Sequence, residues 1–220
     1  MTGAQGELAQ GFVLHARPFR ENSRILELIT ASAGRVTVLA RSRSGSLRPF
    51  VLLDLAWRGR GELPNLSVGE ERRVFPLAGR ALVCALYLNE LVLRLIPRDA
   101  REGGVVPILE QAYGGLLAAE RLEYPLRAAE WALLCLIDSG LEHLAAEGVN
   151  PADYYDYRPE LGLSGPLPRN RPGAVSGAVL LALASGAGVP DNAQRAARDF
   201  MRRLIDAHLD GRELHTRRLL

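Results

Sequence analysis

The apolar pattern of this chain changes at Pro76, and that change constrains the fold more than any other feature. Before Pro76, five short apolar or alternating segments are separated by turn residues; they cover residues 11–17, 23–30, 35–41, 49–57 and 63–74. In the third segment Val36, Val38 and Ala40 share one face, which is the period of a half-buried β-strand. Five strands in so short a stretch predict a small barrel, either an OB-fold or an SH3-like barrel.

After Pro76 the apolar residues recur at helical spacing. We expect helices over residues 81–96, 105–119, 125–139, 174–185 and 193–209. Pro125 suits a first helical turn, Asp191 or Asn192 suits the cap of the last helix, and Gly211 suits its end. Between these helices, residues 149–172 are rich in Gly and Pro, have no cysteine and predict an irregular segment. The sequence therefore predicts an α+β protein with a barrel domain, residues 1–79, and an α-helical domain, residues 80–220.

Charge is distributed unevenly along the chain. All 27 basic residues other than histidine are arginines, and the net charge of +2 divides into +5 for residues 1–80, −7 for 81–160 and +4 for 161–220. Arginine binds phosphate and carboxylate groups as a two-pronged donor, so the basic surfaces are candidates for nucleic-acid binding. A cluster of surface arginines is equally consistent with an ordinary solvated face.

Signatures of catalysis, metal binding and membrane insertion are missing from the sequence. It contains no P-loop, dinucleotide-binding glycine motif, zinc-protease helix or nucleophile elbow, and its four histidines are widely separated. Cys84 and Cys135 are too few for a structural zinc site. No apolar run reaches the roughly 18 residues of a membrane span, and the first residues do not resemble a signal peptide. We therefore expect a cytoplasmic protein that is not an enzyme and has no cofactor or metal.

Five segments, in order along the chain, resemble the RecO family of recombination mediators. Two lie in the barrel region, GFVLHARPFRENSRILELIT and SAGRVTVLARSRSGSLRPF. The third, ALYLNELVLRLIP, contains the family's Y-x-N-E-L pattern as Tyr87, Asn89, Glu90 and Leu91. The fourth is LRAAEWALLCLIDSGL, and the fifth is GRELHTRRLL, with Thr216 where serine is commoner. The resemblance covers nearly the whole chain.

The resemblance implies an N-terminal OB-fold and a helical domain in a bacterial, nucleoid-associated protein. It implies binding of single- and double-stranded DNA, annealing of complementary strands, and cooperation with RecR in loading RecA onto DNA coated by single-strand-binding protein (SSB). Many members carry a four-cysteine zinc module in the helical domain. The corresponding residues 149–169 contain no cysteine here, so this chain resembles the zinc-free branch.

Four arginines of the third strand and the loop after it are the predicted DNA contacts: Arg35, Arg41, Arg43 and Arg48. OB-folds bind single strands through a basic groove and stacked aromatic rings. The barrel region has few aromatic residues, and Phe12, Phe50 and Trp57 suit a core as well as a stacking surface. We therefore expect binding to be mainly electrostatic. The alternative is an adaptor whose barrel docks a protein, and a cluster of ionisable side chains in a cleft would instead favour a hydrolase.

The resemblance also places a site for the acidic SSB tail, which ends in phenylalanine, in the helical domain. Such a site needs an apolar pocket and cations, and Arg127, Arg121 and Leu126 are the predicted contacts. The competing interpretation of Arg127 is an ion pair with Glu130 at i,i+3 spacing on the same helix.

Overall fold

A computed structural model describes most of the chain, which forms two compact units. Unit 1 comprises Met1–Leu117 with Thr216–Leu220, and unit 2 comprises Ala118–His215. The expected domain boundary at residue 79 coincides with the start of the first helix, whereas the compact units divide at residue 117. The described residues are 8–41, 47–59, 61, 63–98, 103–138, 140–141, 144, 148–186 and 188–220.

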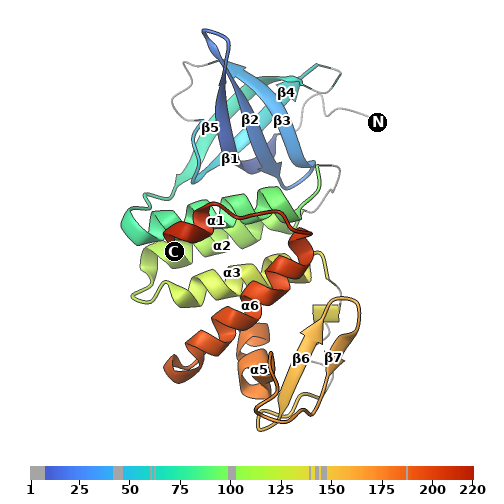
Figure 1. The fold of residues 1–220 in the computed structure, drawn as a ribbon. Helices are drawn as coiled ribbons and strands as arrows, with labels where there is room; N and C mark the ends of the chain where they lie inside the picture. Colours follow the sequence, from blue (N-terminus) through green and yellow to red (C-terminus); the bar gives the residue numbers. More distant parts are fainter. Residues whose placement is uncertain are drawn as a thin grey trace. The chain divides into compact units, whose positions relative to one another are not determined.

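Five strands close into a barrel in unit 1 (Figure 1). Neighbouring strands pair antiparallel except β3 and β5, which pair in parallel. They are β1 (Ala9–Phe19), β2 (Ser23–Thr30), β3 (Gly34–Arg41), β4 (Val51–Arg58) and β5 (Asn65–Val74). The strand order β1-β2-β3-β5-β4, with β4 returning to β1, is a Greek-key barrel, and it confirms the OB-fold over the SH3-like alternative. The predicted α+β class is also confirmed.

The barrel encloses the side chains that alternate inward along its strands. Val38 and Ala40 are buried as the alternation predicted, and Val36 packs against the same core. On β1, by contrast, Phe12, Val13 and Leu14 are all buried, because the outer face of this strand packs on helices rather than facing water. The other members of the core are Leu26, Leu28, Leu47, Val51, Leu53 and Leu55.

Two helices, α1 (Gly79–Leu95) and α2 (Val105–Ala118), complete unit 1. The Tyr113 ring of α2 makes edge contacts with Phe12, Phe50 and Phe75, at centroid distances of 5.2 to 5.6 Å. Its hydroxyl donates to Asn89 Oδ1, and Asn89 Nδ2 donates to the backbone oxygen of β1 at Leu14. Complete burial raises the pKa of Tyr113 above its ordinary value. This aromatic cluster joins barrel and helices into one body.

The last residues of the chain also belong to unit 1. The 3₁₀ turn η3 (Thr216–Leu219) contacts α1, where the Thr216 backbone N–H and hydroxyl both donate to Glu90 Oε2, at 2.8 and 2.6 Å. Asn89 and Glu90 of the Y-x-N-E-L pattern therefore have structural roles, one toward β1 and one toward the end of the chain.

Unit 2 combines helices with a small sheet. Its helices are α3 (Glu123–Cys135), α5 (Gly177–Ser185) and α6 (Gln194–Leu209), and its strands are β6 (Tyr154–Arg158), β7 (Gly162–Ser164) and β8 (Val175–Ser176). The prediction that residues 149–172 are irregular is therefore wrong: β6 and β7 form a hairpin, and β6 also pairs with β8. Burial of Tyr155 and Tyr157 holds this short hairpin against the unit.

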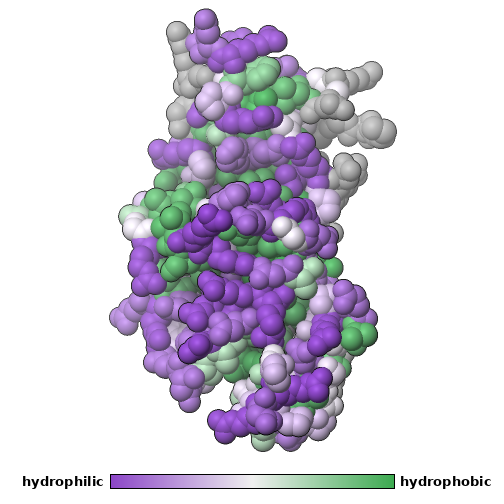
Figure 2. Space-filling view, in the orientation of Figure 1, coloured by the Kyte–Doolittle hydropathy of each residue, from purple (hydrophilic) through white to green (hydrophobic). Residues whose placement is uncertain are grey.

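The start of α6 differs from the prediction as well. Asp191 and Asn192 lie in a 3₁₀ turn, η2 (Asp191–Ala193), and Ala193 is the N-cap without a side-chain cap. The carboxylate of Asp191 is engaged by other side chains described below. The exposed side of α6 is hydrophilic, as the purple surface over this helix in Figure 2 shows, while Phe200, Met201 and Leu204 are buried.

Candidate functional site

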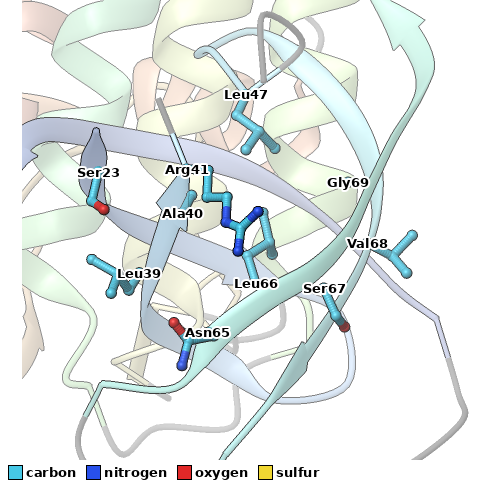
Figure 3. A pocket seen from close by; sticks show the side chains of 10 residues that line it. All are labelled: Ser23, Leu39, Ala40, Arg41, Leu47, Asn65, Leu66, Ser67, Val68 and Gly69. Atoms are coloured by element: carbon cyan, nitrogen blue, oxygen red, sulfur yellow. The ribbon is translucent and has the colours of Figure 1, made fainter. Parts of the chain in front are cut away.

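A groove lies between β3 and β5 on the barrel wall (Figure 3). The two strands pair only at Leu39 and Asn65, so beyond this point the wall is open rather than closed by a hydrogen-bonded ladder. The resulting cavity has a volume of about 520 Å³. It is lined by Ser23, Leu39, Ala40, Arg41, Leu47, Asn65, Leu66, Ser67, Val68 and Gly69.

The groove lining combines one cation with apolar and neutral polar side chains. Arg41 extends across the groove toward Leu66 in Figure 3 and, within the described part of the chain, makes no ion pair or hydrogen bond through its side chain. Asn65, Ser67 and Ser23 supply neutral polar groups, and none of the described lining residues is acidic. Among the described residues, an anion entering the groove meets an uncommitted guanidinium and no lining carboxylate.

Of the four predicted DNA contacts, two are exposed, one lies outside the described residues, and one, Arg35, has a buried side chain. Arg41 lines the groove, and Arg48 is exposed just before β4, without an ion-pair partner among the described residues. Arg43 lies outside the residues that the structure describes. The lining residues Asn65 and Ser67 were missed, although the polar residues at alternate positions of β5 were a visible signal.

Arg35 does not belong to this surface, and its prediction as a DNA contact is contradicted by its burial. The side chain is 9% exposed, and Nη1 donates to the carbonyl oxygens of Leu93 and Ile96, at 2.9 and 2.6 Å. Nη2 lies 3.4 Å from Glu27, whose other oxygen accepts from Arg98 at 2.8 Å. Burial lowers the pKa of Arg35, and the Glu27 carboxylate opposes that shift. Arg35 thus holds the C-terminal end of α1 against β2 and β3.

In unit 2 the predicted peptide contacts lie around a shallow depression. Arg127, Tyr124, Leu183, Val189 and Gln194 are among its lining residues. Leu126 is 4% exposed and belongs to the core, so it does not present a surface to a ligand as predicted. The remaining lining residues are Ala128, Ala182, Gly186 and Gly188.

Both predicted cations of unit 2 are paired with acids of their own unit. Arg127 pairs with Glu130, the i,i+3 contact considered from the sequence, and Glu130 is only 1% exposed. Arg121 pairs with Asp191 of η2, and its guanidinium carbon lies 5.3 Å from the centre of the Tyr124 ring. Tyr124 and Asp191 were missed, because no local pattern reports a contact across about 70 positions of sequence.

The aromatic side chains of the barrel region are mostly internal. Phe12, Phe50 and Phe75 are at most 9% exposed, and only Phe19 and Trp57 of this region are partly exposed. None of them lines the groove between β3 and β5. The groove is therefore suited to electrostatic contacts with a backbone rather than to stacking of bases.

The described residues offer neither a metal-binding cluster nor a membrane-spanning helix. They contain no group of three or more His, Cys, Asp or Glu side chains placed to hold a metal ion. Cys84 is buried, Cys135 is partly exposed, and the two form no disulfide. No described helix combines the length and apolar character needed to cross a membrane.

Comparisons with known proteins agree with this architecture. The family model "Recombination protein O N terminal" matches residues 7–75, which span the barrel. The chain is 36% identical to the DNA repair protein RecO of Pseudomonas paraeruginosa over 94% of this chain and 92% of that protein. It is 39% identical to RecO of Methylococcus capsulatus, over 96% and 92%, and 38% identical to RecO of Halorhodospira halophila, over 100% and 97%. The chain therefore belongs to the RecO family of bacterial DNA repair proteins, and a role in DNA repair and recombination follows from that membership.

Proposed function

We propose that this protein is a recombination mediator that binds single- and double-stranded DNA through the open side of its barrel. In that role it anneals complementary strands and, with RecR, helps to load RecA onto DNA coated by SSB. The proposal is carried by two exposed arginines, neither of which has an ion-pair partner in the described part of the chain. Arg41 lines the groove, and Arg48 follows the lining residue Leu47 in the chain.

The groove suits a ligand recognised by charge rather than by sequence. Phosphate neutralisation by arginine releases counterions, which supplies affinity without a preference for particular bases. A mediator has to act on any sequence, and annealing requires that two backbones be neutralised while their bases stay free to pair. The absence of aromatic rings from the groove lining is consistent with this mode.

The test is a salt series on a double variant, Arg41→Ala with Arg48→Ala. Two lost phosphate contacts should lower the slope of log affinity against log salt by about 1.4 for single strands, at about 0.7 per contact. Arg80→Ala is the matched control, because Arg80 is an exposed arginine of unit 1 that does not line the groove.

Three outcomes separate the alternatives. A lowered slope in the double variant alone supports the groove. An unchanged slope with strong DNA binding moves the DNA surface elsewhere, and the exposed Arg198 and Arg202 of α6 are then the next variants to test. Wild-type protein without salt-dependent DNA affinity would leave the adaptor interpretation, in which the barrel docks a protein.

For unit 2 we propose a binding site for the acidic tail of SSB at the depression beside α3. The support is the combination of apolar side chains such as Leu183 and Val189 with Arg121, Arg127 and Tyr124 at one place. Anisotropy titration of a labelled acidic peptide ending in phenylalanine tests this proposal. Binding that survives Arg121→Ala unchanged would place the site elsewhere.

A further inference from the structure

The two cations beside the depression differ in how readily they can leave their internal partners. Arg127 is 12% exposed and pairs with a carboxylate that is 1% exposed. If Arg127 turned toward a ligand, the Glu130 carboxylate would remain buried without this ion pair, which is unfavourable. Arg127 is therefore committed to the fold and contributes to the site mainly through the surface of its side chain.

Arg121 makes a different kind of pair. Its side chain is 43% exposed, and the side chain of Asp191 is 69% exposed, so water can solvate both groups when they separate. Exposed ion pairs are weak for this reason. The Arg121–Asp191 contact is consequently one that a ligand carboxylate can replace at little cost.

Asp191 is held in the way that a ligand carboxylate would be held. Its Oδ1 accepts from the Arg121 guanidinium and faces the Tyr124 hydroxyl at 3.4 Å. Tyr124 itself lines the depression, and so do Val189 and Gln194, which flank Asp191 in the sequence. The hydrogen bond with Asp191 raises the pKa of Arg121, as expected for a guanidinium that faces a carboxylate.

We propose that Asp191 is an internal ligand of the acidic-peptide site, occupying Arg121 and Tyr124 until a peptide carboxylate replaces it. Asp191 thereby determines specificity: a peptide that brings a carboxylate exchanges one ion pair for another, whereas a neutral peptide leaves the internal pair in place. This inference rests on the proposed peptide site of unit 2.

The test compares Asp191→Asn with wild-type protein in titrations of a labelled peptide of several aspartates ending in phenylalanine with a free carboxylate. Removing a competitor raises affinity by the reciprocal of the fraction of sites that are free. For an exposed pair of ordinary strength the expected gain is about threefold to sixfold. Thermal unfolding should shift by no more than about 4 °C, because the lost pair is exposed.

Asp199→Asn is the matched control. Asp199 is a half-exposed acid of unit 2 that pairs with Arg195 and Arg198 and does not line the depression. Its removal changes the net charge of the unit equally, so it measures the general electrostatic gain. In the Arg121→Ala background, Asp191→Asn should add no more than the general electrostatic gain that Asp199→Asn measures, because the competitor acts mainly through its ion pair with Arg121.

The outcomes distinguish this inference from the site on which it rests. A gain in Asp191→Asn that exceeds the gain in Asp199→Asn and disappears without Arg121 supports the internal ligand. Equal gains in both variants overturn the internal ligand while leaving the peptide site intact. Lack of peptide binding by the wild type and by every variant overturns the peptide site itself, and the inference with it.

Discussion

The two compact units carry opposite net charge. Unit 1 has 17 arginines against 11 acidic residues, a net charge of +6, whereas unit 2 has 10 against 14, a net charge of −4. Long-range attraction of a polyanion therefore belongs to unit 1. This division was hidden in the sequence, because the stretches +5, −7 and +4 do not coincide with the compact units.

Their arginines also differ in how they are used. Six of the ten arginines in unit 2 pair with acids of the same unit: Arg121, Arg127, Arg158, Arg195, Arg198 and Arg203. In the described part of the barrel, Arg17, Arg41, Arg48 and Arg58 are exposed without an ion pair. Unit 1 can thus bind an anion directly at these positions, while an anion that binds at Arg121 of unit 2 has to exchange with an internal acid. Burial and pairing, rather than the number of cations, therefore decide which arginines are available to a ligand.

The largest expected effect breaks a buried pair in unit 2. Arg127→Glu places a second carboxylate beside buried Glu130 and should lower the free energy of unfolding by about 3–5 kcal/mol, measured by urea denaturation. Arg121→Glu, at an exposed pair, should leave the urea midpoint nearly unchanged while abolishing acidic-peptide binding. DNA annealing should persist in Arg121→Glu. Equal destabilisation by both substitutions would contradict the distinction between committed and exchangeable arginines.

A second prediction applies the same contrast to unit 1. Arg35→Ala leaves the carbonyls at the end of α1 and the Glu27 carboxylate short of a donor, and should cost about 2–4 kcal/mol. Arg41→Ala should cost no more than about 0.5 kcal/mol, because its side chain is exposed and unpaired. Chemical denaturation of both variants measures the difference. A fully stable Arg35→Ala protein would mean that Arg98 and Thr37 satisfy the Glu27 carboxylate without Arg35.

A third prediction tests the contact that joins barrel and helices. Tyr113→Phe removes the hydroxyl that donates to Asn89 and should cost about 1–2 kcal/mol at neutral pH. Because the pKa of Tyr113 is raised in the folded protein, the stability of the wild type also depends on pH in the alkaline range. Above about pH 10 the unfolded chain loses this proton while the folded protein keeps it, so wild-type stability falls with rising pH. The ionisation of Tyr113 makes wild-type stability fall by about 1.4 kcal/mol per pH unit in this range, and the Tyr113→Phe variant should lack this part of the fall. Parallel alkaline curves for variant and wild type would show that Tyr113 ionises freely.

The smallest expected effect concerns metal, where both units should behave alike. Purified protein should contain no stoichiometric zinc, and a chelator should leave its thermal unfolding unchanged, because two cysteines cannot complete a structural site. Elemental analysis and calorimetry check this expectation. One tightly held zinc ion per chain would refute it.

Local patterns gave the strands and helices with good accuracy. The five expected strands and five expected helices all occur, because alternation and helical spacing record which face of an element is buried. The hairpin of β6 and β7 was missed, since its strands are short and lie among turn-forming residues. The burial of both faces of β1 was not predicted, because the helices that cover its outer face lie far along the chain.

For the sites, the sequence by itself determined the type of residue and the family, and tertiary structure decided which residues are available. The arginines of the third strand and the loop after it made the barrel wall the candidate DNA-binding surface. Five motifs in order along the chain indicated the RecO family. Only the folded structure shows that Arg35 donates its hydrogen bonds to carbonyl oxygens at the end of α1. Arg41, six positions later on the same strand, instead lines the open groove. Only folding brought Asp191 to Arg121. The physical reason is that a charge is free or committed according to its partners and its exposure to water, and both depend on contacts between residues distant in sequence.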